Sequence, residues 1–156
     1  MFPYVGDYKL YHCQGDRRFS GVYGNYLSYS QPGPLGVPWT GGMDKVSEIV
    51  RPQEKYIFVE ESDTRPYAGG AWGLGVKEWG RDGWCDGLAV WHNKSSTFGF
   101  GDGHAEKHKW INEETLERSN LDFSGPEGGA YGYDAWEPGE PREDLDWLQA
   151  HWPYAR

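Results

Sequence analysis

The segment Trp91–Trp110, WHNKSSTFGFGDGHAEKHKW, concentrates side chains that can do chemistry. It holds His92, His104 and His108, together with Asp102. Imidazole and carboxylate groups are zinc ligands, and a histidine beside a carboxylate is a common acid–base pair. The same residues are also typical of a tight β-hairpin, because Asp-Gly favours a turn with positive φ. The two interpretations predict different functions.

The hairpin interpretation predicts that residues 95–101 and 104–110 pair antiparallel around Asp102-Gly103. Gly103 is then expected at positive φ. With Asp102-Gly103 as a two-residue turn, Gly101 faces His104 across the hairpin, and Phe98 and Phe100 point towards a core.

The same register sends three side chains, His104, Glu106 and His108, to the opposite face of the hairpin. His104 and His108 lie four residues apart, roughly 13 Å at about 3.3 Å per residue along a strand, so they cannot share one ion. The remaining metal set is His92, Asp102 and His104, if the strand ends converge. A solvated or hydrogen-bonding hairpin face is favoured over this set, and a buried hydrogen-bonding role is favoured for His92.

Acid–base or nucleophilic catalysis is the least favoured interpretation. The sequence has no GxSxG, HExxH, P-loop or nucleotide-binding fingerprint. We therefore expect no catalytic residue and no enzyme activity.

Composition supports a small extracellular type of domain without a nucleic-acid partner. The chain has 156 residues, which favours one domain over residues 1–156, and its net charge is −9. Phosphate and anionic lipid are bound by clustered Lys and Arg, so this charge argues against both. Aromatic residues make up 17% of the chain and must supply much of the core. Cys13 and Cys85 fit no CxxC spacing and are either two free thiols or one disulfide.

The pattern of elements indicates an α+β fold with a small sheet, short helices and long Gly/Trp-rich loops. Lys55–Ser62 is the clearest strand, and its two apolar faces predict a central position. Leu88–His92 is a second expected strand, and residues 63–87 read as a long loop. Weaker signals predict an edge element in residues 1–13, an irregular strand in 21–30, and short helices in 43–52, 112–119 and 143–152. In the last helix, Leu145, Leu148 and Trp152 form one stripe.

Nine residues separate His92 from Asp102-Gly103, and this spacing resembles the H-X9-DG motif of prepilin-type, pseudopilin-like proteins. The stretch WHNKSSTFGFGDGHA resembles the usual family form of that motif. Three further stretches resemble family segments in the right order: PYVGDYKLYHCQGD, VSEIVRPQEKYIFVEESD and EDLDWLQAHWP. The family proline after the cysteine is replaced by Gln14, which is a departure.

The resemblance implies a small antiparallel sheet and a non-enzymatic structural subunit of a type II secretion or type IV pilus-like filament. Its partners would be other pseudopilin-like or pilin-like subunits. The family begins with a prepilin-type leader and a long hydrophobic helix, so the chain is expected to be the globular part alone. That part would lie in the periplasm or on the cell surface, held to the inner membrane only through the missing helix.

The resemblance also implies a place for calcium, which major type II pseudopilins bind in a C-terminal loop. The candidate ligands here are Asp122, Glu127 and Asp134, with backbone carbonyls between them. A solvated acidic loop is the favoured alternative. No other cofactor is expected.

The second functional hypothesis is an extracellular carbohydrate-binding module. Its basis is the group of tryptophans in Gly-rich loops: Trp39, Trp72, Trp79, Trp84 and Trp136. Flat indole rings stack on sugars when they are exposed. The alternative is that these rings pack the loops onto the sheet.

Overall fold

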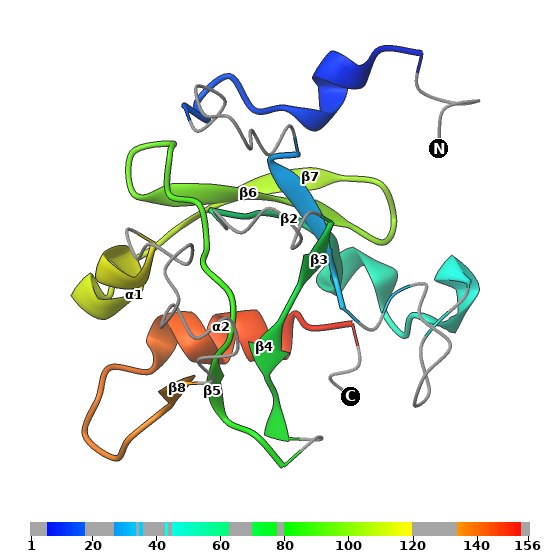
Figure 1. Ribbon diagram of the computed structural model, residues 1–156. Helices are drawn as coiled ribbons and strands as arrows, with labels where there is room; N and C mark the ends of the chain where they lie inside the picture. Colours follow the sequence, from blue (N-terminus) through cyan, green and yellow to red (C-terminus); the bar gives the residue numbers. More distant parts are fainter. Residues whose placement is uncertain are drawn as a thin grey trace.

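The computed structural model describes residues 6–17, 27–33, 35, 43, 45–62, 70–77, 80–119 and 134–153. Its central layer is a five-stranded sheet of order β3-β1-β2-β6-β7 (Figure 1). These strands are β1 (Tyr29–Pro32), β2 (Tyr56–Glu60), β3 (Ala71–Trp72), β6 (Ser95–Phe100) and β7 (Ala105–Lys109). Neighbouring strands are antiparallel, except that β1 and β3 pair in parallel at one edge. The fold is α+β with a small sheet, as expected.

A second, three-stranded antiparallel sheet lies in the part of the chain that was expected to be loop. It consists of β4 (Leu74–Gly75), β5 (Gly83–Trp84) and β8 (Asp134–Ala135), in the order β4-β5-β8. Each strand has only two residues, so no alternation of apolar and polar residues can develop. The expectation that residues 63–87 form one long loop without strands was therefore wrong for its described part.

The helices are short and lie on both sides of the large sheet (Figure 1). The α-helices are α1 (Glu113–Arg118) and α2 (Glu143–Ala150), and the 3₁₀ turns are η1 (Tyr8–Tyr11), η3 (Val46–Glu48) and η4 (Pro52–Glu54). Helix α2 and the second sheet lie on one side, and the N-terminal segment with η1 lies on the other. The two predicted C-terminal helices are confirmed, and the edge element expected in residues 1–13 contains η1.

The helix predicted over residues 43–52 is instead two separate 3₁₀ turns. Arg51 lies between them with φ of 56°, a left-handed conformation that no α-helix contains. Of the expected apolar stripe only Ile49 is buried, since Val46 and Val50 are 55% and 63% exposed. Without a buried stripe, so short a segment gains too little from packing to form a helix.

Strand β2 occupies the centre of the large sheet, as its apolar sequence predicted. Its pairing with β6 shifts register between Tyr56 and Phe58. Because the shift breaks the two-residue alternation, Tyr56 and Val59 are both fully buried, whereas Phe58 is 38% exposed. Simple alternation of apolar faces therefore does not describe this strand.

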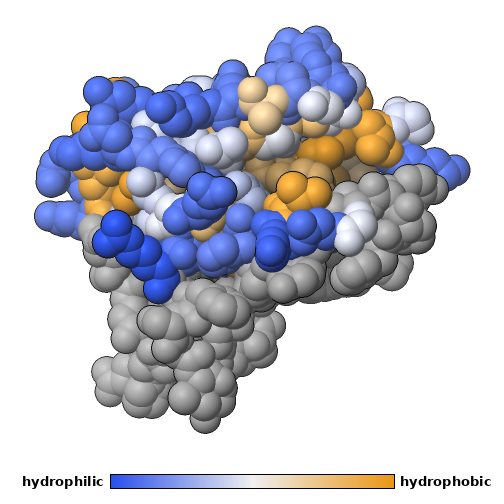
Figure 2. All heavy atoms as spheres, turned by 90° about the horizontal axis from the view of Figure 1, so that it is seen from above, coloured by the Kyte–Doolittle hydropathy of each residue, from blue (hydrophilic) through white to orange (hydrophobic). Residues whose placement is uncertain are grey.

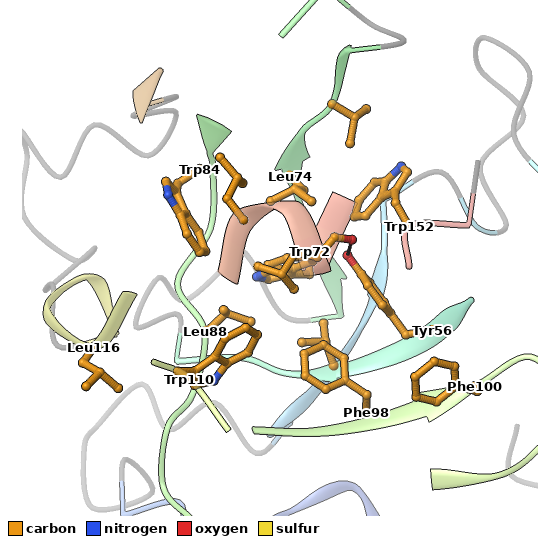
Figure 3. Packing of buried hydrophobic residues seen from close by; sticks show 14 residues of the cluster. Tyr56, Trp72, Leu74, Trp84, Leu88, Phe98, Phe100, Trp110, Leu116 and Trp152 are labelled. Atoms are coloured by element: carbon orange, nitrogen blue, oxygen red, sulfur yellow. Dashed lines mark hydrogen bonds between the residues drawn. The ribbon is translucent and has the colours of Figure 1, made fainter. Parts of the chain in front are cut away.

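The core is built mainly from aromatic rings between β2, β6 and α2 (Figure 3). Tyr56 lies at its centre, with ring centroids 5.2 Å from Phe98 and 6.0 Å from Trp152. The Tyr56 hydroxyl donates to the Leu148 carbonyl at 3.1 Å, which anchors α2 to the sheet. The predicted stripe of α2 is confirmed, because Leu145, Leu148 and Trp152 are all buried.

The hairpin prediction is confirmed in its position but wrong by one residue in its register. Strands β6 and β7 pair antiparallel, and Gly103 has φ of 96°. The Phe100 N–H donates to the His104 carbonyl at 2.8 Å, and the Gly103 N–H donates to the Phe100 carbonyl at 3.0 Å. The loop therefore has three residues, a turn closed by a left-handed glycine, which Asp-Gly also accommodates.

The register error changes the face on which the hairpin histidines lie. A slip of one residue moves every side chain of a strand to the other side. His104 and His108 therefore share the face of the buried phenylalanines: His104 stacks on Phe100 at 4.4 Å, and His108 stacks on Trp147 at 3.8 Å. The expectation that they point away from the core was wrong.

Replacing Gly103 with valine is expected to lower the free energy of unfolding by at least about 1 kcal/mol, because a β-branched residue resists positive φ. A Cβ on Gly103 would meet no atom within 4 Å, so the cost comes from backbone strain alone. Urea unfolding measures it. Gly6→Val is the matched control, since Gly6 also has open space but no positive φ. Equal effects of the two changes would contradict the turn.

The environment of His108 predicts a pH-dependent stability. Burial lowers the pKa of His108, the carboxylates of Asp144 and Glu106 oppose this, and His151 adds to it. A lowered folded-state pKa means that the folded protein binds fewer protons than the unfolded chain. The stability that neutral His108 contributes is fully present above the pKa of an unfolded histidine, about 6.5. It is lost as the pH falls through the lower pKa of the folded state. Below about pH 6.5, His108→Gln should therefore lose stability less steeply than the parent in urea unfolding. Parallel pH profiles would contradict it.

Candidate functional site

Three side chains from distant segments of the chain meet in one cluster: Cys13, Glu60 and His92. One ligand-type atom of each, the Cys13 sulfur, a Glu60 carboxylate oxygen and a His92 ring nitrogen, lies within 4.8 Å of the other two. His92 Nε2 is 2.9 Å from Glu60 Oε1 and 3.3 Å from Cys13 Sγ. The cluster joins the N-terminal segment, the end of β2 and the turn before β6.

Glu60 is the last residue of β2, and its side chain is completely buried. Its Oε2 atom accepts the backbone N–H of Thr97 on β6 at 2.7 Å, while Oε1 faces His92. A buried carboxylate is tolerated only when it is paired in this way. The Glu60 side chain is therefore held in one orientation by the sheet itself.

His92 is positioned by a tight turn at the start of β6. Asn93 and Lys94 have φ of 57° and 60°, and the His92 N–H points to the Ser95 carbonyl at 3.4 Å. Two consecutive positive φ values are the mark of a two-residue type I′ turn. The segment Leu88–His92, expected as a strand, contributes only an isolated bridge from Leu88 to Glu61 and then this turn.

Cys13 is positioned by a set of bonds just after η1. Its N–H donates to Ser28 Oγ at 3.0 Å, and Ser28 Oγ donates to Asp16 Oδ2 at 2.7 Å. The Gly15 N–H donates to Cys13 Sγ at 3.3 Å. A Cβ on Gly15 would lie only 3.1 Å from the Trp91 Cβ, so a side chain here would require its neighbours to move by a few tenths of an ångström.

The Cys13 thiol does not have the character of an activated nucleophile. Burial raises the pKa of the Cys13 thiol, and the Glu60 carboxylate raises it further against the lowering effect of the Gly15 N–H. Catalytic cysteines have lowered pKa values. In a catalytic triad the histidine also uses one ring nitrogen for the nucleophile and the other for the acid. Here Cys13 and Glu60 both face the same atom, His92 Nε2.

An open pocket of about 570 Å³ lies beside the cluster and is lined by Gln14, Gly15, Arg17 and Trp91. The His92 side chain of the cluster is itself 35% exposed. Figure 2 views the molecule from the side of the N-terminal segment, where hydrophilic side chains surround smaller groups of hydrophobic ones. A small polar ligand or ion has access here, whereas a deep substrate cavity is not among the described features.

Asp102 and His104 lie at the far end of β6 from His92. His104 Nδ1 is 2.6 Å from Asp102 Oδ1, and both side chains are well exposed. The backbone N–H and the ring of His104 lower the pKa of Asp102. The six residues of β6 span roughly 20 Å at about 3.3 Å each. The predicted metal set of His92, Asp102 and His104 was therefore wrong, because the two strand ends do not converge.

The spacing between His92 and Asp102 has a simple structural origin. The nine intervening residues are two turn residues, the six residues of β6, and Gly101. His92 thus precedes the turn that opens the strand, and Asp102-Gly103 form the turn that closes it. The spacing measures the length of one strand.

The described tryptophans are mostly core residues. Trp72 is fully buried and Trp84 is 7% exposed, so neither presents a face to a sugar ring. Trp136 is half-buried, with the Arg142 guanidinium 4.6 Å from its ring. The other two tryptophans of the carbohydrate hypothesis, Trp39 and Trp79, lie outside the described residues.

The expected calcium loop falls largely outside the described residues. Asp122 and Glu127 are among the residues that are not described, and Asp134 is described only through its backbone pairing with Trp84. Cys13 and Cys85 are both free thiols. Burial, followed by the charge of Asp86, raises the pKa of Cys85 to about 11.

Comparisons with known proteins identify no relative of this chain. No family model matches the chain, and it matches neither a curated protein nor a solved structure significantly. Within the described part of the chain, none of the helices has the length and apolar character needed to cross a bilayer.

The left-handed turn beside His92 offers a test of its backbone strain. A non-glycine residue with left-handed φ costs roughly 1–2 kcal/mol, and asparagine tolerates this conformation better than lysine. Lys94→Gly is therefore expected to raise the free energy of unfolding by about 0.5–1 kcal/mol after the entropy cost of glycine. Asn93→Gly is the matched control and should gain less. Destabilisation by Lys94→Gly in urea unfolding would contradict the turn assignment.

Proposed function

We propose that the chain is the globular domain of a non-enzymatic, pseudopilin-like structural subunit of a type II secretion or type IV pilus-like filament. The observation that carries this proposal is the structural use of the motif by which the chain resembles that class. His92 and Asp102-Gly103 bracket strand β6, and His92 pairs with the buried carboxylate of Glu60. Residues that build a domain in this way fit a structural subunit better than an enzyme.

The chemistry of the cluster also supports a non-enzymatic role. The one thiol beside a histidine, Cys13, has a raised pKa and shares His92 Nε2 with Glu60. General acid–base catalysis needs a base that reaches a proton of the substrate, and a nucleophile needs a base of its own. In this cluster the Cys13 thiol has no base of its own, because His92 Nε2 also faces Glu60.

The proposal includes a place and partners for the domain. It would lie in the periplasm or at the cell surface, anchored in the inner membrane by a hydrophobic helix. Its partners would be other pseudopilin-like subunits. Burial of Trp72 and Trp84 removes support from the carbohydrate-binding alternative.

The test is processing of the full-length gene product. We expect co-expression with a prepilin peptidase to cleave a leader, to leave the protein in the membrane fraction, and to allow cross-linking into subunit ladders. A variant of the leader at the cleavage site is the control for specific processing. A full-length protein with no leader, or one released in soluble form by an ordinary signal peptidase, would overturn the proposal.

Replacing His92 with alanine is expected to change stability and no catalytic rate. Glu60 would lose its partner in a fully buried place, which costs about 1–3 kcal/mol. Lys107→Ala, at an exposed position of β7, is the control and should stay within about 0.5 kcal/mol. Urea unfolding measures both. A turnover assay over a panel of glycosides and esters checks the expectation that no catalytic rate changes. A rate that depends on His92 would refute the structural role.

A further inference from the structure

We propose that Cys13, Glu60 and His92 bind a zinc ion, which ties the N-terminal segment to the central sheet. The proposal goes beyond a structural role for the domain and does not depend on it. Its first support is that the three residues present one sulfur, one nitrogen and one oxygen to a common point. These are the atoms that zinc binds in proteins.

The distances within the cluster are close to those of a tetrahedral zinc site. Zinc lies about 2.3 Å from sulfur and about 2.0–2.1 Å from nitrogen or oxygen, so neighbouring ligand atoms are roughly 3.3–3.6 Å apart. Cys13 Sγ is 3.3 Å from His92 Nε2, and His92 Nε2 is 2.9 Å from Glu60 Oε1. The third pair, Cys13 Sγ and a Glu60 carboxylate oxygen, lies within 4.8 Å, so side-chain shifts of at most about one ångström would admit the ion.

Hydrogen bonds can join the three side chains only through the His92 ring N–H and the Cys13 S–H, which is a weak donor. Cys13 and Glu60 both face His92 Nε2, and that nitrogen carries at most one hydrogen. Its N–H donates well to only one of the two acceptors. A metal ion at the centre binds all three atoms at once.

The charges favour a divalent cation. Glu60 is fully buried, and a buried carboxylate needs a countercharge or several donors. On binding, the Cys13 S–H bond breaks, its proton passes to solvent, and a zinc–sulfur bond forms. His92 binds through Nε2 as a neutral ring with its proton on Nδ1. A thiolate, a carboxylate and Zn²⁺ then sum to zero charge.

The surroundings already hold two of the ligands in place. The Thr97 N–H holds the second oxygen of Glu60, and the Gly15 N–H points to the Cys13 sulfur. Such supporting bonds orient metal ligands. Three protein ligands leave a fourth position, which water fills from the open side where His92 is partly exposed. A thiol and an imidazole select zinc over calcium or magnesium, which prefer oxygen.

The experiment uses the untagged 156-residue chain, freed of metal by a chelator. Zinc affinity is measured by competition with a chelating dye, and cobalt serves as a spectroscopic probe of the same site. We expect one ion per chain, a sulfur-to-cobalt charge-transfer band, and a melting temperature that rises with the logarithm of the zinc concentration. Calcium should produce none of these effects at this cluster.

Variants locate the ion. Cys13→Ser should abolish the charge-transfer band, and His92→Gln and Glu60→Gln should each weaken zinc binding by ~100-fold or more, since even loss of a supporting bond costs 10–100-fold. Cys85→Ser, which removes the other free thiol, is the matched control and should keep the band. Circular dichroism of the metal-free variants establishes that they are folded. Absence of stoichiometric zinc binding in the parent, or loss of the band in Cys85→Ser but not in Cys13→Ser, would overturn the proposal.

Discussion

The buried carboxylate of Glu60 is the constraint on which the rest of this side of the molecule depends. It sits at the end of the central strand, where water cannot solvate it, so its oxygens must find partners within the protein. One oxygen fixes the backbone of β6 through Thr97, and the other fixes His92. His92 in turn meets Cys13, which holds the N-terminal segment against the sheet. One charge thus organises three segments that are far apart in sequence.

The other face of the sheet is held mainly by packed aromatic rings. Aliphatic side chains are scarce, so Tyr56, Phe98 and the tryptophans supply most of the buried volume. Polar contacts then fix the direction of the last helix: the Tyr56 hydroxyl donates to the Leu148 carbonyl, and the buried Lys55 ammonium donates to the Ala150 carbonyl at 2.6 Å. A cation at the C-terminal end of a helix is also favoured by the helix dipole.

Local signals in the sequence predicted the features whose causes are local. Strand β2, the Asp-Gly hairpin and the stripe of α2 were all foreseeable from periodicity and turn chemistry. The register was not, because Asp-Gly suits loops of two and of three residues. Nor was the cluster: Cys13, Glu60 and His92 meet through tertiary packing, and no spacing rule joins them. The one available hint was a glutamate inside the best apolar strand, which had to be buried and therefore paired.

The nine-residue spacing between His92 and Asp102 couples the cluster to the core. It is set by the length of β6, since a turn lies at each end of that strand. If the spacing changed by one residue while both turns were kept, every side chain of one part of the strand would move to the opposite face. Either His92 would leave Glu60 without a partner, or Phe98 and Phe100 would leave the core. Both outcomes lower stability, because the first leaves a buried charge without a partner and the second exposes two aromatic rings to water. The spacing in this chain is therefore fixed from both faces of the sheet at once, by core packing on one face and by the pairing of Glu60 on the other.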